Sequence, residues 1–149
     1  GADMIRTAAM ALALCAALPA AAAEVTDCDR PEANVRNLAR PFASATREFA
    51  NGDVALVSLL LEEPACCGAH LVVTLPDPEI GYGLCRFVTS DDGLGWSSLD
   101  LVGAQARYDP ATGLQIALPG QRYEGTGFVP FTLHLTVNQA ESRVEAREE

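Results

Sequence analysis

Apolar and polar residues alternate along much of the chain with the two-residue period of β-strands. The clearest example is the run GFVPFTLHLTVNQ at 127–139, in which Phe131, Leu133, Leu135 and Val137 fall on one face. Alternation of this kind is typical of half-buried strands. The same pattern, or a short apolar run, predicts further strands at VALVSLLLEE (54–63), AHLVVTLP (69–76), YGLCRFVTS (82–90), WSSLDLVGAQARY (96–108) and LQIAL (114–118).

Turn-forming clusters rich in glycine, proline and aspartate separate these runs, and DPATG at 109–113 is a strong hairpin signal. Short strands with a turn about every 8–12 residues are typical of an antiparallel β-sandwich or a small β-barrel. We see no internal repeat or linker, so we predict a single, mainly β domain over residues 24–149. Its charged end, AESRVEAREE at 140–149, is expected to be frayed.

A short N-terminal helix is predicted before the first strand. Asp29 and Glu32 have the spacing of a capping box, and apolar residues follow at roughly helical intervals as far as Phe49. The pair Asn51-Gly52 would end such a helix. The alternative is that residues 43–49 form a strand that turns at Asn51-Gly52 into the next one.

Residues 1–23 have the pattern of an expression remnant followed by a cleavable secretory signal. One basic residue, Arg6, precedes an apolar run at 7–18, and small residues in an A-x-A arrangement predict cleavage before Glu24. The apolar run is too short for a membrane-spanning helix, which needs about 20 residues. We therefore expect Cys15 to leave with the signal, no membrane span in the mature chain, and a periplasmic or extracellular location.

Export to an oxidising compartment favours disulfides among Cys28, Cys66, Cys67 and Cys85. A bridge between the adjacent Cys66 and Cys67 would close a very small ring, and neighbours in an extended segment point to opposite faces. We therefore predict two disulfides in which Cys66 and Cys67 have different partners, one being Cys28 and the other Cys85. Which partner belongs to which stays open. Each bridge would contribute about 3–4 kcal/mol on the chain-entropy model.

The stretch CCGAH allows a second hypothesis, in which Cys66, Cys67 and His70 form a metal-binding or thiol-dependent site. The stretch lacks the two-residue spacer by which paired cysteines converge on zinc. His134, the only other histidine, belongs to no second half-site. We therefore predict no metal and no other cofactor, and keep this site as the alternative.

The chain has 20 acidic residues against 10 basic ones, a formal net charge of −10. Nucleic acids and anionic membranes attract basic surfaces, so neither is expected as a partner. A protein partner, and a basic one in particular, fits this charge. No nucleophile elbow, zincin motif, phosphate-binding loop or dinucleotide fingerprint occurs, so we expect binding without catalysis.

Two glycine-rich turns next to aromatic residues are the candidate binding loops, because such turns form adaptable contact surfaces. They are SDDGLGW at 90–96 and PGQRYEGTG at 119–127. The candidate contact residues are Asp91, Asp92, Trp96, Arg122 and Tyr123. The sequence thus predicts an exported binding module whose partner it does not identify.

The segment LPGQRYEGTGF at 118–128 resembles the S-G-x-x-Y loop of the periplasmic inhibitors of c-type lysozymes, with Gly120 and Tyr123 at matching positions. Pro119 stands where that family has serine, and a chain without lysine lacks the family's lysine-bearing second motif. The resemblance is confined to this segment. It implies a small, exported, disulfide-bonded β-barrel whose loop enters the cleft of a basic enzyme such as a lysozyme.

Overall fold

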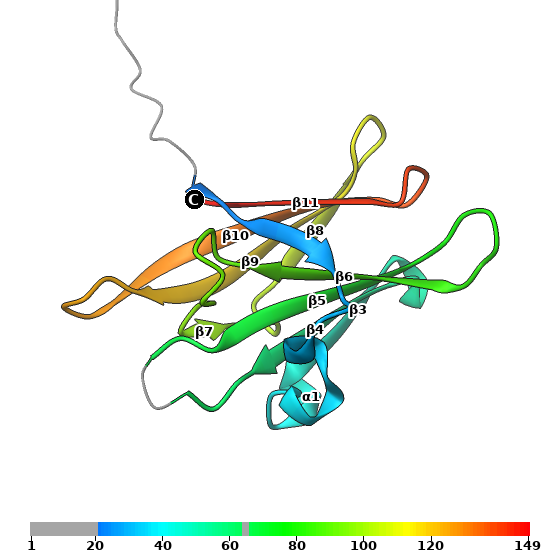
Figure 1. Cartoon of the computed structure of the whole chain (residues 1–149). Coiled ribbons are helices and arrows are strands. Elements are labelled where there is room, and N and C mark those ends of the chain that lie inside the picture. Colours follow the sequence, from blue (N-terminus) through cyan, green and yellow to red (C-terminus); the bar gives the residue numbers. More distant parts are fainter. Residues whose placement is uncertain (1–20, 64–65) are drawn as a thin grey trace, which may run out of the picture.

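The computed structural model describes residues 21–63 and 66–149. Two antiparallel sheets account for most of the described chain (Figure 1). The first sheet contains β1 (Ala21–Ala22), β7 (Ser98–Leu99), β8 (Gln105–Asp109), β9 (Gly113–Tyr123), β10 (Phe128–Asn138) and β11 (Arg143–Glu148). The second contains β2 (Glu24–Asp27), β3 (Thr46–Phe49), β4 (Val54–Leu60), β5 (Ala69–Pro76) and β6 (Gly83–Thr89). Short helical turns are η1 (Pro31–Ala33), η2 (Val35–Asn37), α1 (Phe42–Ala45) and η3 (Ala50–Gly52).

The strand order confirms the predicted antiparallel β architecture and, of the two predicted forms, sandwich or small barrel, agrees with the sandwich. In the first sheet the order is β1-β11-β10-β9, with β7 and β8 pairing with successive parts of the same edge of β9. In the second sheet the order is β2-β6-β5-β4-β3. Both sheets described here end in edge strands and are open, so the fold is a sandwich and not a closed barrel.

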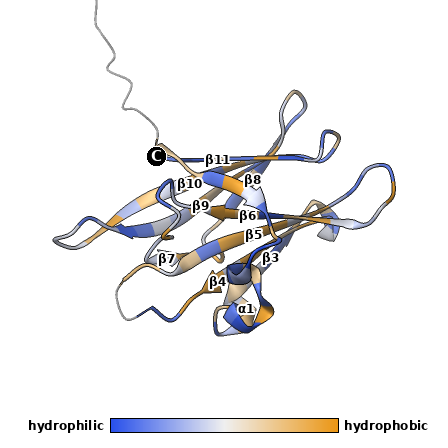
Figure 2. Ribbon diagram, in the orientation of Figure 1, coloured by the Kyte–Doolittle hydropathy of each residue, from blue (hydrophilic) through white to orange (hydrophobic). Residues whose placement is uncertain are grey.

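The core lies between the sheets, where the predicted alternation places it. Phe131, Leu133, Leu135 and Val137 of β10 are all buried on the inner face. They meet the inward residues of the second sheet, including Leu71 on β5, in one continuous apolar cluster. The apolar colouring of the central strands in Figure 2 follows this layer.

The second sheet is also covered on its outer face, which explains why β5 is apolar along most of its length. Phe87 and Val72 point outward from the sheet into a smaller cluster. The chain between β2 and η1 covers them: Cys28 is bonded to Cys85, and the Arg30 guanidinium lies 4.1 Å from the centre of the Phe87 ring. A strand buried on both faces loses its polar alternation.

The short N-terminal helical segment is present, but as separate short turns and not as one continuous helix, and a strand follows it. Residues 31–45 form η1, η2 and α1, and residues 46–49 form β3, paired with β4. The alternative prediction, a strand over residues 43–49 that turns at Asn51-Gly52 into the next one, is correct for residues 46–49, while residues 43–45 belong to α1. Asn51 and Gly52 have positive φ values of 57° and 92°, which this tight connection requires. Pro41, in the middle of the predicted helix, lacks the N–H group that a continuous helix would need there.

Two further expectations differ from the structure. The tail predicted to be frayed forms β11, whose inward Val144 joins the core while Arg143, Glu145 and Arg147 point to solvent. The predicted strand 96–108 is broken into β7 and β8 by a turn in which Asp100 accepts a hydrogen bond from the Gly103 N–H.

Most of the predicted secretory signal, residues 1–20 with Cys15, lies outside the described residues. Its expected last residues include Ala21 and Ala22, which form β1 beside β11. Among the helices that the structure describes, none is long and apolar enough to cross a membrane.

The cysteines form two disulfides, but the predicted pairing is wrong: Cys28 is bonded to Cys85, and Cys66 to Cys67. Strand register explains the first bridge, because β2 pairs with β6 and Asp27 lies opposite Arg86. Cys28 thus follows directly beside Cys85 on the outer face, with their Cα atoms 5.5 Å apart. Cys66 and Cys67 lie in the connection between β4 and β5, and neither of them is bonded to Cys28 or Cys85.

We expect the two bridges to differ in their effect on stability. Replacing Cys28 and Cys85 by alanine should lower the free energy of unfolding by about 4 kcal/mol, because this bridge closes the long loop between them. The Cys66–Cys67 bridge closes almost no loop, because the two residues are adjacent. The C66A/C67A variant should therefore lose far less free energy of unfolding. Urea unfolding of the two double variants tests this difference, and equal losses would contradict it.

Candidate functional site

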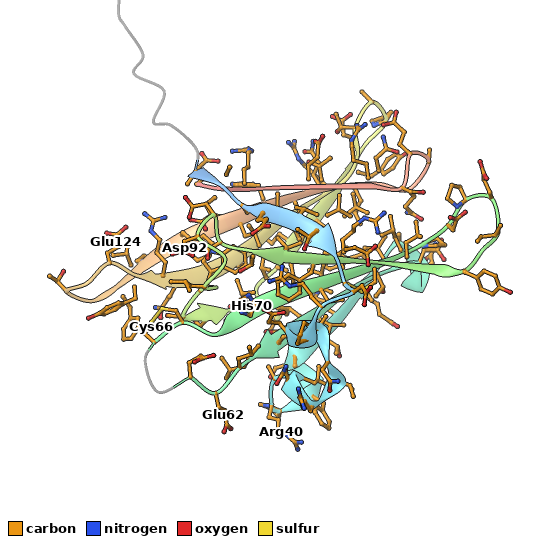
Figure 3. All side chains as sticks on the ribbon, viewed as in Figure 1. Arg40, Glu62, Cys66, His70, Asp92 and Glu124 are labelled. Carbon is orange, nitrogen blue, oxygen red and sulfur yellow. A yellow bond between two sulfur atoms is a disulfide. The ribbon has the colours of Figure 1, made fainter. Side chains whose placement is uncertain are left out.

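One end of the sandwich contains a hollow of about 320 Å³, which we call the end hollow. Three connections and the end of β11 form it; the connections are the one between β4 and β5, the segment between β6 and β7, and the end of the β9–β10 hairpin. Figure 3 shows Cys66, Asp92 and Glu124 gathered at this end. The residues that line the end hollow are Cys66, Cys67, Ser90, Asp91, Asp92, Leu94, Gly95, Trp96, Arg122, Tyr123 and Glu148.

All five candidate contact residues lie on the end hollow, although they come from two loops nearly 30 positions apart. Strand pairing explains the convergence: Ser98 and Leu99 lie opposite Gln121 and Gly120, which brings the segment before β7 beside the end of β9. Their role in binding remains a prediction. Sequence reasoning missed Glu148, since it lay in a tail expected to be frayed.

Trp96 forms the floor of the hollow and joins the two sheets. Its backbone exchanges two hydrogen bonds of 2.9 Å with Ala69 of β5, in the second sheet. Its indole N–H donates to the carboxylate of Glu148 on β11, in the first sheet, and its ring lies 5.7 Å from that of Phe131 on β10. With 1% of its surface exposed, Trp96 is a core residue that reaches the hollow only by its edge.

Glu148 is a buried carboxylate with two partners. One oxygen accepts the Trp96 indole hydrogen bond, and the other lies 3.5 Å from a guanidinium nitrogen of Arg122. Arg122 also pairs with Glu124 at 2.8 Å. A buried charge needs such partners, because an unpaired carboxylate is costly to remove from water.

The loop at 90–95 is held by a compact set of hydrogen bonds. The Ser90 hydroxyl donates to Asp92 at 2.6 Å and accepts from the Gly95 N–H at 2.9 Å, while the Leu94 N–H donates to Asp92 at 3.0 Å. The hydrogen bonds from Ser90 and Leu94 hold the pKa of Asp92 below its ordinary value. Asp92 is therefore ionised at neutral pH and contributes a fixed negative charge to the rim.

Gly95 lies where only glycine fits. Its φ is +93°, and a Cβ there would come within 2.6 Å of the Ala69 carbonyl and 2.8 Å of the His70 ring. The chain must approach β5 this closely for the next residue, Trp96, to pair with Ala69. The glycine thus permits the floor of the hollow to form.

Apolar surface forms the walls of the hollow. Leu94 is 68% exposed, and Tyr123 is about half exposed, with its ring 5.6 Å from that of Phe128 across the hairpin. The Cys66–Cys67 bridge lines the side nearest the second sheet. Cys67 has a positive φ of 91°, a region that non-glycine residues seldom adopt.

His70 does not combine with the adjacent cysteines in a metal or thiol site. Its Nδ1 lies 2.8 Å from the Thr89 hydroxyl, and its ring packs 5.0 Å from that of Phe87. Both cysteine sulfurs are consumed by their mutual bond. Within residues 21–63 and 66–149, no three histidine, cysteine or acidic side chains are grouped as metal ligands. The geometry gives the alternative hypothesis no support.

The segment that resembles lysozyme inhibitors is not a loop over its whole length. Residues 118–123 belong to β9, and Gly120 is buried beneath Phe131, whose ring atoms would lie 2.7 Å from an added Cβ. Only the turn after Tyr123 is free to enter a cleft. The Tyr123 hydroxyl closes this turn by donating to the Gly125 carbonyl at 2.9 Å.

Comparison with known protein families, curated proteins and solved structures finds no match to this chain.

Replacing Glu148 by alanine should lower the free energy of unfolding by about 1–3 kcal/mol, because it leaves the buried Trp96 indole N–H without an acceptor. Glu145→Ala, on the exposed face of the same strand, serves as the control and should change stability by less than about 0.5 kcal/mol. Denaturant unfolding measures both variants. A Glu148 variant as stable as the Glu145 control would show that the indole hydrogen bond is not needed.

His70 should make stability depend on pH. Burial, and then the nearby Arg30 charge, lower the pKa of His70 below its ordinary value, so the folded state favours the neutral ring. As pH falls through about 6.5, the unfolded chain binds the proton first and stability declines. We expect His70→Gln to flatten the fall in unfolding free energy between about pH 7.5 and 5.

The control for this measurement is His134→Gln, which removes the other histidine from a partly exposed position on β10. Urea unfolding is followed at each pH for the wild type and for both variants. If His70→Gln keeps the wild-type slope, His70 is not the group that titrates on unfolding.

Proposed function

We propose that the protein is an exported, non-catalytic binding module whose end hollow takes up a cationic side chain of a protein partner. The observation that carries the proposal is the composition of the hollow. Three carboxylates, of Asp91, Asp92 and Glu148, line it against the single guanidinium of Arg122. Apolar walls stand beside these charges, at Leu94 and Tyr123.

This combination suits lysine or arginine. Both side chains bury an apolar stem while the charged head remains near solvent or a counter-ion. The stem would pack on Leu94 and Tyr123, and the head would reach the rim carboxylates of Asp91 and Asp92. The hydrogen bonds that hold the 90–95 loop keep the Asp92 carboxylate in place before a partner arrives, which reduces the ordering cost of binding.

The net charge supports a basic partner, and the disulfides support export to an oxidising compartment. A net charge of −10 favours encounter with a basic partner. Two disulfides are stable in oxidising compartments, in keeping with the secretory signal that the sequence predicts. A basic enzyme such as a c-type lysozyme is one partner of this kind, and it is a defined probe.

The test is selection of random displayed peptides on the folded protein, followed by affinity measurement with purified peptides and with a c-type lysozyme. We expect the selected peptides to carry lysine or arginine beside apolar residues. The double variant D91N/D92N should bind them about tenfold more weakly, and wild-type binding should weaken as salt rises.

A matched control separates local contact from overall charge. D53N/E79Q removes two carboxylates from connections at the opposite end of the sandwich, where β4 begins and where β5 leads to β6. This variant should bind like the wild type. Selected peptides without basic residues, or equal weakening by both double variants, would refute the proposal.

A further inference from the structure

A second hollow, of about 390 Å³, lies on the outer face of the first sheet, across β8, β9, β10 and β11. We call it the sheet hollow. It is separate from the end hollow and shares no lining residue with it. Its polar lining side chains are Gln105, Arg107, Gln115, His134, Thr136 and Arg147.

Strand register explains why the face is hollowed here. One row of directly paired residues runs Gln105, Ala117, His134 and Arg147 across the four strands. Alanine is the only short side chain in this row, so a depression forms above it between longer neighbours. The adjacent row places Arg107, Gln115 and Thr136 along one side of the depression and ends at Glu145 on β11, which does not line it.

The charge of the sheet hollow is opposite to that of the whole molecule. The chain carries a net charge of −10, yet Arg107 and Arg147 line this hollow and none of its lining residues is acidic. The two arginines come from strands on opposite sides of it, β8 and β11. Guanidinium groups present planar pairs of donors that match a carboxylate.

A carboxylate of the chain itself already occupies one edge of this site. One side-chain oxygen of Glu149 lies 3.0 Å from His134 Nε2 and 3.1 Å from an Arg147 guanidinium nitrogen. The two groups therefore converge on a single carboxylate oxygen. The Glu149 side chain is 64% exposed, and such an exposed pair is weak enough for another anion to displace it.

We propose that the sheet hollow binds a small carboxylate-bearing sugar. The carboxylate lies between Arg107 and Arg147 and replaces Glu149 on Arg147. The side-chain amides of Gln105 and Gln115, with the Thr136 hydroxyl, are neutral donors and acceptors of the kind that sugar hydroxyls need. The hollow has the size of small-molecule sites, which occupy about 300–1,000 Å³. This inference does not depend on the proposed function of the end hollow.

The experiment titrates the whole chain with D-glucuronate at constant ionic strength, followed by NMR or calorimetry. D-Glucose and inorganic phosphate are the comparison probes. We expect glucuronate to bind in the millimolar range, and glucose and phosphate at least about tenfold more weakly. R107Q and R147Q should each weaken glucuronate binding by about tenfold.

Two further variants make the test specific. R143Q removes an arginine from the same strand as Arg147 but outside the hollow, and should leave glucuronate binding unchanged. E149Q removes the competing carboxylate and should tighten binding several-fold. A thermal unfolding midpoint close to that of the wild type confirms that each variant is folded.

Three results would overturn the inference. The first is no binding of glucuronate at tens of millimolar. The second is phosphate binding as tight as that of glucuronate, which would make the hollow a general anion site. The third is an equal loss of binding in R143Q and R147Q, which would mean that bulk charge alone attracts the ligand. D91N/D92N leaves the sheet hollow intact, so failure of either proposal is distinguishable from failure of the other.

Discussion

The placement of Trp96 is the constraint on which this end of the structure depends. Its backbone pairs with Ala69 in the second sheet, while its indole bonds to Glu148 in the first. One residue thus belongs to both layers of the sandwich, and the chain must cross between the sheets at this point. Gly95 makes the crossing possible, and the loops before and after it are drawn together around the end hollow.

The acidic protein has two hollows whose lining residues carry opposite net charge. The end hollow gathers the carboxylates of Asp91, Asp92 and Glu148 beside apolar walls. The sheet hollow places Arg107 and Arg147 on opposite sides of one depression. The net charge of the chain alone predicts only cationic partners. The register of the strands, which sets rows of residues side by side, creates the exception.

Local patterns predicted the strands well where one face of a strand is buried and the other is solvated, as in β10. They failed where a long-range contact decides the outcome. The cysteine pairing follows from the register of β2 on β6, which no local pattern reveals. Glu148 was assigned to a frayed tail because β11 is short and rich in charged residues, and the only strongly apolar residue in it is Val144. The glycine-rich turns suggested the candidate contact residues, whose role stays a prediction, but their convergence on one hollow follows from the pairing of β7 with β9.

The most direct test of the central claim is an NMR map of the end hollow with a bound cationic peptide. Uniformly ¹⁵N-labelled protein would be titrated with the tightest-binding basic peptide from the display selection. We predict the largest shifts at the backbone amides of Asp92 and Leu94, which lie at the rim where the cationic head and its apolar stem would bind. If the peptide binds while these two resonances stay unmoved, the hollow is not the binding site and the account is wrong.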